Sequence, residues 1–298
     1  SNTSLLANFS ADIKLIPKIL TARLIYGINT ENAERNFFIP STTYFDQLNR
    51  SRGALSTSKR QNQTIDATVS YKQRLLNAVD VDAVAGFGEY PANSSGFTAT
   101  GADMMDAIGT DALGSASLSS QTVTSFRSQT KQRSYFARSS FNYQNRYLLM
   151  LSFRYDGYSQ FFPQNKYASF PSASLGWNLA NESFLRNVRF INLLKLRASI
   201  GVTGSAGSQA YGTFSPDGNI ITFNDGAVAY VPYLLTQLDN PNLQWPKTVN
   251  KNLGLDFSLF GERVSGSFDI FRDDLTRLIT NVNTAMLSQI STEPVNSG

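Results

Sequence analysis

Residues 146–156 follow a strict two-residue periodicity, and this feature constrains the fold of the chain most. A period of two indicates a β-strand, because successive side chains point to opposite faces of a sheet. One series of alternate residues is apolar and carries an aromatic ring at each end, which is typical of a strand that crosses a bilayer with its other face toward a polar lumen. The apolar series is Tyr147, Leu149, Leu151, Phe153 and Tyr155, and the other is Arg146, Leu148, Met150, Ser152, Arg154 and Asp156.

About ten segments show this alternation, and their connections alternate between tight turns and longer stretches. Tight turns are expected at Pro17-Lys18, near Asn77, at Gln144-Asn145 and at Gly261-Glu262, and the longer connections at 30–62, 89–130, 158–166 and 204–246. Antiparallel neighbours send alternate connections to opposite ends of a sheet. We therefore predict an all-β fold, an antiparallel up-and-down transmembrane sheet with its tight turns at one end and its long connections at the other. The expected strands are 5–15, 20–28, 65–71, 79–87, 135–143, 146–156, 173–179, 194–202, 253–259 and 264–270.

The composition narrows the possible functions. Charged residues make up 16% of the chain, below the roughly 25% of soluble domains, and no apolar run reaches the roughly 20 residues of a membrane helix. The chain contains no Cys and no His, which excludes thiol catalysis, Ser-His-Asp catalysis and histidine metal or haem sites. The net charge of +4 is scattered, so nucleic acid is not an expected partner. We expect neither an enzyme nor a catalytic residue, cofactor or metal site.

Aromatic residues beside Asn, Asp and Gln mark the long connections as candidate binding segments. Exposed rings supply contact area and amides supply orientation when a protein binds sugars or peptides. The alternative is that these rings pack the connections against one another, and the residues alone favour neither interpretation. The candidate contacts are Phe37, Phe38, Tyr44, Tyr158, Phe161, Tyr211, Phe214, Tyr230 and Tyr233.

Four ordered motifs carry a family resemblance. They are Tyr135-Phe136-Ala137-Arg138 followed by Arg146-Tyr147-Leu148-Leu149; Asp156-Gly157-Tyr158-Ser159 followed by Phe170-Pro171-Ser172; Leu194-Lys195-Leu196-Arg197-Ala198-Ser199; and Asn240-Pro241-Asn242-Leu243 with Trp245. In these motifs the chain resembles the SusC/RagA-like TonB-dependent outer-membrane transporters. It departs from the family at Pro246, where the family usually has Glu. The resemblance implies that residues 1–298 are an internal segment of a barrel of about 22 strands, unclosed alone and lacking the plug domain, the TonB-contacting segment and the C-terminal strands.

The resemblance also implies a function. Such a protein imports oligosaccharides (glycans) or peptides across the Gram-negative outer membrane, with energy relayed by TonB and a SusD-like surface lipoprotein as a lid over the outer connections. The aromatic candidates would then meet substrate or lid. The expected lumen wall comprises Arg23, Lys72, Arg138, Arg154, Lys195 and Arg197. Two alternatives stay open. One is a complete small outer-membrane β-barrel pore or enzyme, which needs a closing strand. The other is a soluble β-rich binding protein, in which charged residues should interrupt the apolar faces of the strands.

Overall fold

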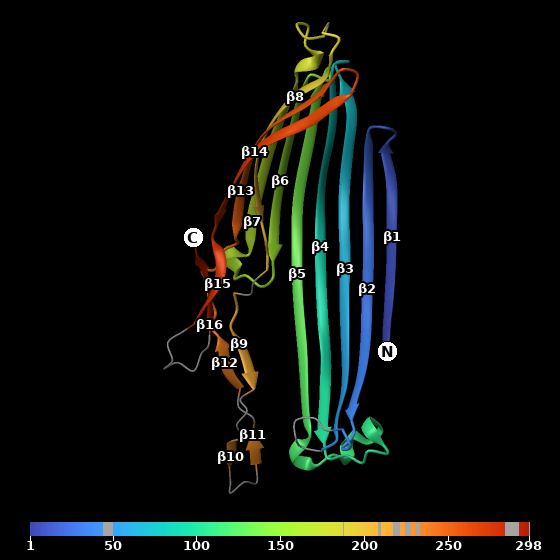
Figure 1. Cartoon of the computed structure of the whole chain (residues 1–298), viewed down its shortest axis with the longest axis vertical. Helices are drawn as coiled ribbons and strands as arrows, with labels where there is room; N and C mark the ends of the chain where they lie inside the picture. Colours follow the sequence, from blue (N-terminus) through green and yellow to red (C-terminus); the bar gives the residue numbers. More distant parts are fainter. Residues whose placement is uncertain are drawn as a thin grey trace. The chain divides into compact units, whose positions relative to one another are not determined.

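Ten strands form one sheet in the order of the chain (Figure 1). The computed structural model describes residues 1–43, 50–186, 188–207, 210–216, 221–223, 228–230, 233–283 and 292–297. Among the described strands β1 and β14 are the two edges and do not pair with each other, so the predicted all-β, up-and-down, unclosed sheet is confirmed. The strands are β1 (Asn2–Ile16), β2 (Leu20–Ile39), β3 (Arg52–Leu75), β4 (Val79–Ala102), β5 (Thr122–Tyr143), β6 (Tyr147–Tyr158), β7 (Tyr167–Asn178), β8 (Ile191–Gly204), β13 (Lys247–Leu259) and β14 (Val264–Thr276).

The chain divides into two compact units, and several strands contribute to both. The first unit comprises Ser1–Ala11, Leu24–Asp66 and Glu89–Lys131, and the second comprises Asp12–Arg23, Ala67–Gly88 and Gln132–Gly298. Each unit is described by itself below.

The predicted tight turns are confirmed in the second unit. Gln144 and Asn145 both have positive φ, as the central residues of a type I′ hairpin turn require, and the Asn142 side chain accepts a hydrogen bond from the Asn145 N–H at 3.0 Å. Backbone hydrogen bonds join this turn to its neighbours, from Gln144 N to Ala78 O and from Asn178 N to Arg146 O. The tight turns of this unit therefore lie together at one end of the strands.

The connections expected at 30–62 and 89–130 are much shorter than predicted, which corrects the sequence interpretation. β2 continues to Ile39 and β3 begins at Arg52, and β4 continues to Ala102 before β5 begins at Thr122. These extensions carry polar side chains on both faces, so they lack the apolar alternation that identifies a half-buried strand. Their backbone groups are satisfied by neighbouring strands whatever the side chains are. The actual connections are 40–51 and 103–121, and the latter contains η1 (Gly109–Ser115) and η2 (Leu118–Ser120).

The connection at 204–246 is confirmed as long, but it contains strands that the sequence did not predict. β9 (Thr213–Pro216) pairs antiparallel with β12 (Tyr233–Gln237), and β10 (Ile221–Phe223) with β11 (Val228–Tyr230). After β14 the chain adds β15 (Leu278–Asn283) and β16 (Thr292–Ser297), which form a second sheet with β12 and β9. Short η3 (Pro163–Asn165) and η4 (Leu179–Asn181) complete the second unit. No helix within the described ranges is long and apolar enough to span a membrane.

Candidate functional site

Strand register aligns residues of four strands, β5 to β8, on one face of the second unit. Leu151 of β6 is opposite Ser139 of β5 and Ala173 of β7, and Ala173 is opposite Ile200 of β8. Exposed fractions of 43% at Leu151, 49% at Phe153 and 51% at Ile200 show that nothing in the described chain covers this face. We call it the apolar face. The alternate residues of the same strands make the polar face.

Aromatic rings bound the apolar face at both ends. Near the tight turns, Tyr147 stacks between Tyr143 and Trp177, with ring centroids 6.2 and 6.4 Å apart. At the other end, Tyr155 stacks on Tyr167 at 5.0 Å. Tyr147 and Tyr155 are eight residues apart on β6, which is about 27 Å along a strand and about 21 Å once the strand tilts by about 40°. This separation is close to the roughly 25 Å apolar band of transmembrane barrels, whose aromatic girdles lie at both interfaces.

Glu182, in the connection after β7, contacts the aromatic row near the tight turns, which consists of Tyr143, Tyr147 and Trp177. Its carboxylate accepts a hydrogen bond from Trp177 Nε1 at 3.0 Å, and Arg146 Nη1 lies 3.9 Å from it. Hydrogen bonds from Tyr147 and Trp177 hold the pKa of Glu182 below its usual range. One carboxylate therefore orients the rings of two strands.

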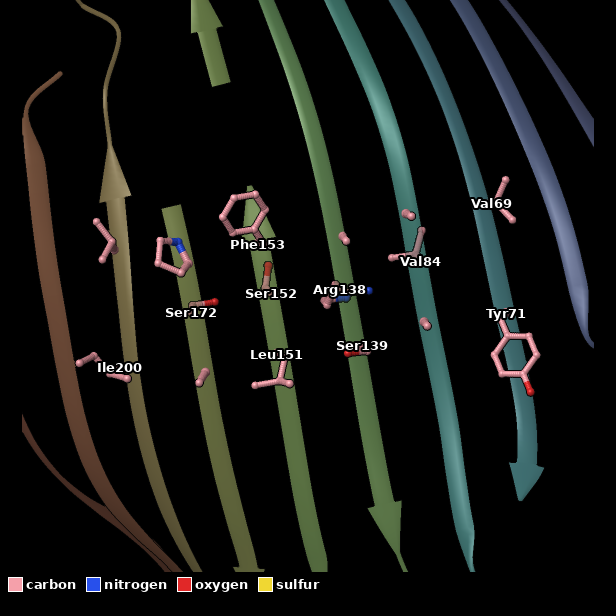
Figure 2. A pocket seen from close by; sticks show the side chains of 16 residues that line it. Val69, Tyr71, Val84, Arg138, Ser139, Leu151, Ser152, Phe153, Ser172 and Ile200 are labelled. Carbon is pink, nitrogen blue, oxygen red and sulfur yellow. The ribbon is translucent and has the colours of Figure 1, made fainter. Parts of the chain in front are cut away.

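A hollow of about 790 Å³ in the second unit lies on the apolar face (Figure 2). It is lined mostly by apolar residues, among them Ala83, Ala137, Val69 and Phe153, and Arg138, Ser152 and Ser172 also contribute to the lining. In a transmembrane sheet this face meets lipid. In such a sheet, a hollow on this face would be filled by acyl chains.

Cations and carboxylates pair along the polar side of the strands. Of the six cations expected in the lumen wall, Arg23 pairs with Asp12 at 2.5 Å, Lys72 lies 4.0 Å from Asp82, and Arg154 pairs with Asp156 at 2.7 Å. Arg197 contacts two carboxylates, Asp256 at 2.8 Å and Asp269 at 3.2 Å. The described chain provides no ion-pair partner for Arg138 or Lys195. Four of these six cations thus pair with carboxylates of the sheet.

Gly254 makes the three-strand contact of Arg197 possible. Gly254 on β13 lies opposite Arg197 on β8 and opposite Asp269 on β14. A Cβ at Gly254 would lie 2.6 Å from Asp269 Oδ1 and 2.9 Å from the guanidinium of Arg197. A side chain would therefore separate Arg197 from Asp269, because it would occupy the space through which the guanidinium crosses β13.

A buried aromatic cluster orders the outer connections of the second unit. Phe161 is completely buried, stacks on Trp245 at 5.4 Å, and belongs to a core with Phe170 and Leu243. Trp245 also donates a hydrogen bond from Nε1 to the Lys166 carbonyl at 3.2 Å. The cluster joins the connection 158–166 to both ends of the connection 204–246, so these two long connections lie at the same end of the second unit, as predicted.

This cluster gives several expected contact residues a packing role. Phe161 has no exposed surface, and Tyr158 packs against it edge-on at 6.2 Å. Tyr211 stacks on Phe162 at 4.4 Å. Packing between connections thus accounts for Phe161, whereas Tyr158 is partly exposed and Tyr211 is 37% exposed. The Asn240-Pro241-Asn242-Leu243 motif serves the same purpose, because Leu243 is buried and the Asn240 side chain donates to the Pro294 carbonyl at 2.8 Å.

Two of the expected contact residues remain open to solvent side by side. Phe214 is 66% exposed and Tyr233 is 67% exposed. In the β9–β12 pair Phe214 is opposite Leu235, and Tyr233 lies two residues before Leu235, so the two rings occupy one face of this strand pair. Tyr230 lies in β11, where the described part of the chain includes only the backbone, and Tyr44 lies outside the described residues.

In the first unit, hydrogen bonds order the connections 40–51 and 103–121. The Ser51 hydroxyl is buried, donates to the Met104 carbonyl at 2.8 Å and accepts from the Met104 N–H at 2.6 Å. Arg50 forms a bidentate ion pair with Asp103, which holds the pKa of Asp103 below its usual range. Hydrogen bonds from the side chain and backbone of Ser41 lower the pKa of Asp106. These polar contacts tie the two connections together.

Phe37 and Phe38 do not lie in a loop, which corrects their predicted location. Both are among the last three residues of strand β2. Phe37 is 55% exposed and lines a small pocket with Arg52 and Thr100. Phe38 is partly buried, and its ring lies near Gly109. Phe37 is therefore the more accessible of the two rings.

The described part of the chain contains no cluster of residues suited to binding a metal ion. No group of three or more His, Cys, Asp or Glu residues there could hold a metal ion. The features that the geometry offers are an apolar face of membrane thickness, a polar face with ordered charges and exposed rings on outer connections. Such an arrangement can bind and guide a solute across a membrane.

The comparison with protein families agrees with this geometry. The model of the TonB dependent receptor-like β-barrel family matches residues 2–297. The chain therefore belongs to this family of receptors and transporters, and the predicted resemblance is confirmed.

Individual relatives point to the SusC/RagA-like branch. The chain is 29% identical over 272 residues to TonB-dependent receptor P3 of Formosa agariphila, covering 89% of this chain and 26% of that protein. It is 34% identical over 181 residues to TonB-dependent receptor SusC of Bacteroides thetaiotaomicron, covering 56% of this chain and 18% of that protein. A structure of the RagAB peptide transporter matches the fold with a TM-score of 0.86 at 19% identity, covering 100% of this chain and 32% of that chain. The matched part of the chain thus spans about a fifth to a third of the length of these proteins.

Proposed function

We propose that this chain forms part of the wall and outer connections of a TonB-energised importer in the Gram-negative outer membrane. The importer would take up oligosaccharides or peptides and work with a SusD-like surface lipoprotein. The plug, the TonB-contacting segment and the remaining strands would belong to the rest of the full-length protein. Family membership and the membrane-thick apolar face support this proposal, and the chain carries out no bond chemistry in it.

The exposed pair Phe214 and Tyr233 is the observation that carries the recognition role. Large apolar rings at two-thirds exposure are costly to leave in water, and the ring of Phe161 in the same group of connections is buried. Rings on one face of a strand pair provide a flat surface on which a sugar ring or a peptide side chain stacks. We assign this surface to the substrate or to the lid protein. Phe37 offers a comparable ring on the first unit.

The test replaces both rings in the full-length protein. A Phe214→Ala/Tyr233→Ala variant should lower uptake of its substrate by about tenfold, because two stacking contacts of about 0.5 to 1.5 kcal/mol each are lost. Uptake by cells would be measured with fluorescent maltoheptaose and, separately, with a labelled casein peptide mixture. Co-purification of the SusD-like lipoprotein would be measured on the same cells, with and without TonB.

Phe184→Ala is the matched control. Phe184 is 65% exposed and lies between β7 and β8, in a connection adjoining the tight turns. Its removal should leave uptake and lid association unchanged. Unchanged uptake and unchanged lid association in the double variant would refute the role of Phe214 and Tyr233, whereas uptake of both probes without TonB would refute the energised importer itself.

A further inference from the structure

A small pocket where β7 and β13 begin has an unusual charge. Its volume is about 240 Å³, and residues from β7, from the start of β13 and from the junction of β14 and β15 line it. This is below the roughly 300 to 1,000 Å³ of pockets for drug-sized ligands, so the pocket suits one small group. We propose that it binds a phosphate group, carried by a lipid headgroup or free in solution.

The charge argument rests on Lys247 and Arg277. Both line the pocket, and its lining includes no carboxylate. Neither side chain has an ion-pair partner within the described residues. Nearby cations of β13 and β14 are neutralised, since Lys251 and Arg272 lie 3.1 and 2.7 Å from oxygens of Asp274. Two cations that line one small pocket without a counterion favour an anion, and arginine and lysine are the residues that proteins use for phosphate.

The two cations are held in place by the fold. Arg277 has a φ of 60°, a left-handed conformation that is uncommon outside glycine and often marks a functional position. Its carbonyl accepts a hydrogen bond from Asn296 Nδ2 at 2.9 Å. Lys247 pairs in register with Thr276 and Gly204, and its ammonium lies 5.9 Å from the centroid of Phe170. The fold thus positions the Arg277 backbone and the Lys247 ammonium, which lowers the entropy cost of binding an anion at Lys247.

The position of the pocket identifies the source of the phosphate. Tyr155 and Tyr167, which form the aromatic row away from the tight turns, line the same pocket. Gly157 lets the Tyr167 ring lie flat over the strand, because a Cβ there would be 2.3 Å from the ring. Aromatic girdles lie at the level of the lipid headgroups, where lipid phosphates are concentrated. A headgroup phosphate is the occupant in our proposal, and only this choice of source depends on the proposed outer-membrane location.

Binding of three probes to the full-length protein in detergent tests the site. The probes are phosphorylated lipid A, the same lipid after enzymatic removal of its phosphates, and inorganic phosphate. The wild-type protein should bind phosphorylated lipid A about tenfold or more tightly than the dephosphorylated form, and a Lys247→Gln/Arg277→Gln variant should lose this preference, because each lost charged hydrogen bond costs about tenfold in affinity. Binding of inorganic phosphate alone, lost in the same variant, would support the site and identify free phosphate as the source.

A paired-cation variant provides the control. Lys251→Gln/Arg272→Gln removes the same charge from the same strands and should leave the preference intact. A Lys247→Arg/Arg277→Lys variant retains both charges and should still bind, so loss of binding through misfolding is recognised. Equal affinity of the wild-type protein and the Lys247→Gln/Arg277→Gln variant for all three probes, or an equal loss in the control, would overturn the proposal. Neither outcome depends on uptake, so failure of the phosphate-site proposal can be distinguished from failure of the importer function.

Discussion

The outer connections of the two units are ordered by opposite means. In the second unit Phe161, Leu243 and Trp245 bury their side chains in an apolar cluster. In the first unit one buried hydroxyl, Ser51, and the Arg50–Asp103 ion pair hold the connection. An apolar cluster resists pH and salt, whereas an exposed ion pair is screened and titrates. The difference shows that the order of one connection in a sheet can be independent of pH and salt while the order of another depends on them.

Trp245→Ala should have the largest effect on this comparison. Removing the buried indole deletes contacts with Phe161 and Phe170 and should destabilise the cluster by about 3 to 5 kcal/mol. Hydrogen exchange of the full-length protein should then rise at 158–170 and 238–247, and stay unchanged at 103–121. Tyr233→Ala, at an exposed ring, should change local stability by less than about 0.5 kcal/mol. Equal exchange in the Trp245→Ala variant and the wild type would show that the connection is not held by apolar packing.

Leu151→Arg should have the next largest effect and should spare both connections. Leu151 is exposed on the apolar face, so an arginine there should cost about 2 to 4 kcal/mol in the membrane-inserted state. Ser152→Arg, one residue along on the polar face, should cost much less. Both costs can be measured by folding the variants into lipid vesicles and following the gel mobility of the folded, heat-resistant form. Equal costs at the two positions would refute the assignment of the faces.

Ser51→Ala should loosen the first unit alone. The buried N–H and carbonyl of Met104 would lose their hydroxyl partner, at a cost of about 1 to 3 kcal/mol. Exchange should rise at 103–121 and not in the aromatic cluster. Ser115→Ala removes an exposed hydroxyl and should have little effect. A Ser51→Ala protein with wild-type exchange would mean that this hydrogen-bonded connection is held by other contacts.

Acid should have the smallest effect, and again only in the first unit. Arg50 depresses the pKa of Asp103, and Ser41 depresses that of Asp106. Stability from a depressed pKa is present above the unfolded value of about 3.9 and is lost as the pH falls through the lower folded value. Exchange at 103–121, corrected for intrinsic rates, should rise below about pH 4. An Asp103→Asn/Asp106→Asn variant should lack this dependence, and an equal acid response in the aromatic cluster would contradict the comparison.

Candidate contact residues could be recognised from the sequence, but their individual roles could not. Aromatic residues in polar connections predicted a binding surface, and Phe161 and Phe214 satisfied that criterion equally. Phe161 is fully buried and Phe214 is 66% exposed. Burial depends on which distant segments meet, here 158–170 with 206–245. The contrast between Lys247 and Lys251 was hidden for the same reason, since only the strand register shows which of them reaches Asp274.

The sequence by itself determined the strand period, the apolar series of each strand, the tight turns and the family. These follow from local patterns, because alternation specifies a strand with one apolar face and lipid requires an uninterrupted apolar series. Only the tertiary structure decided where β2 to β5 end, since polar strand extensions are stabilised by hydrogen bonds to neighbours and leave no hydrophobic pattern. It also decided the contact of Arg197 with two carboxylates across Gly254, because that contact requires three strands in a defined register.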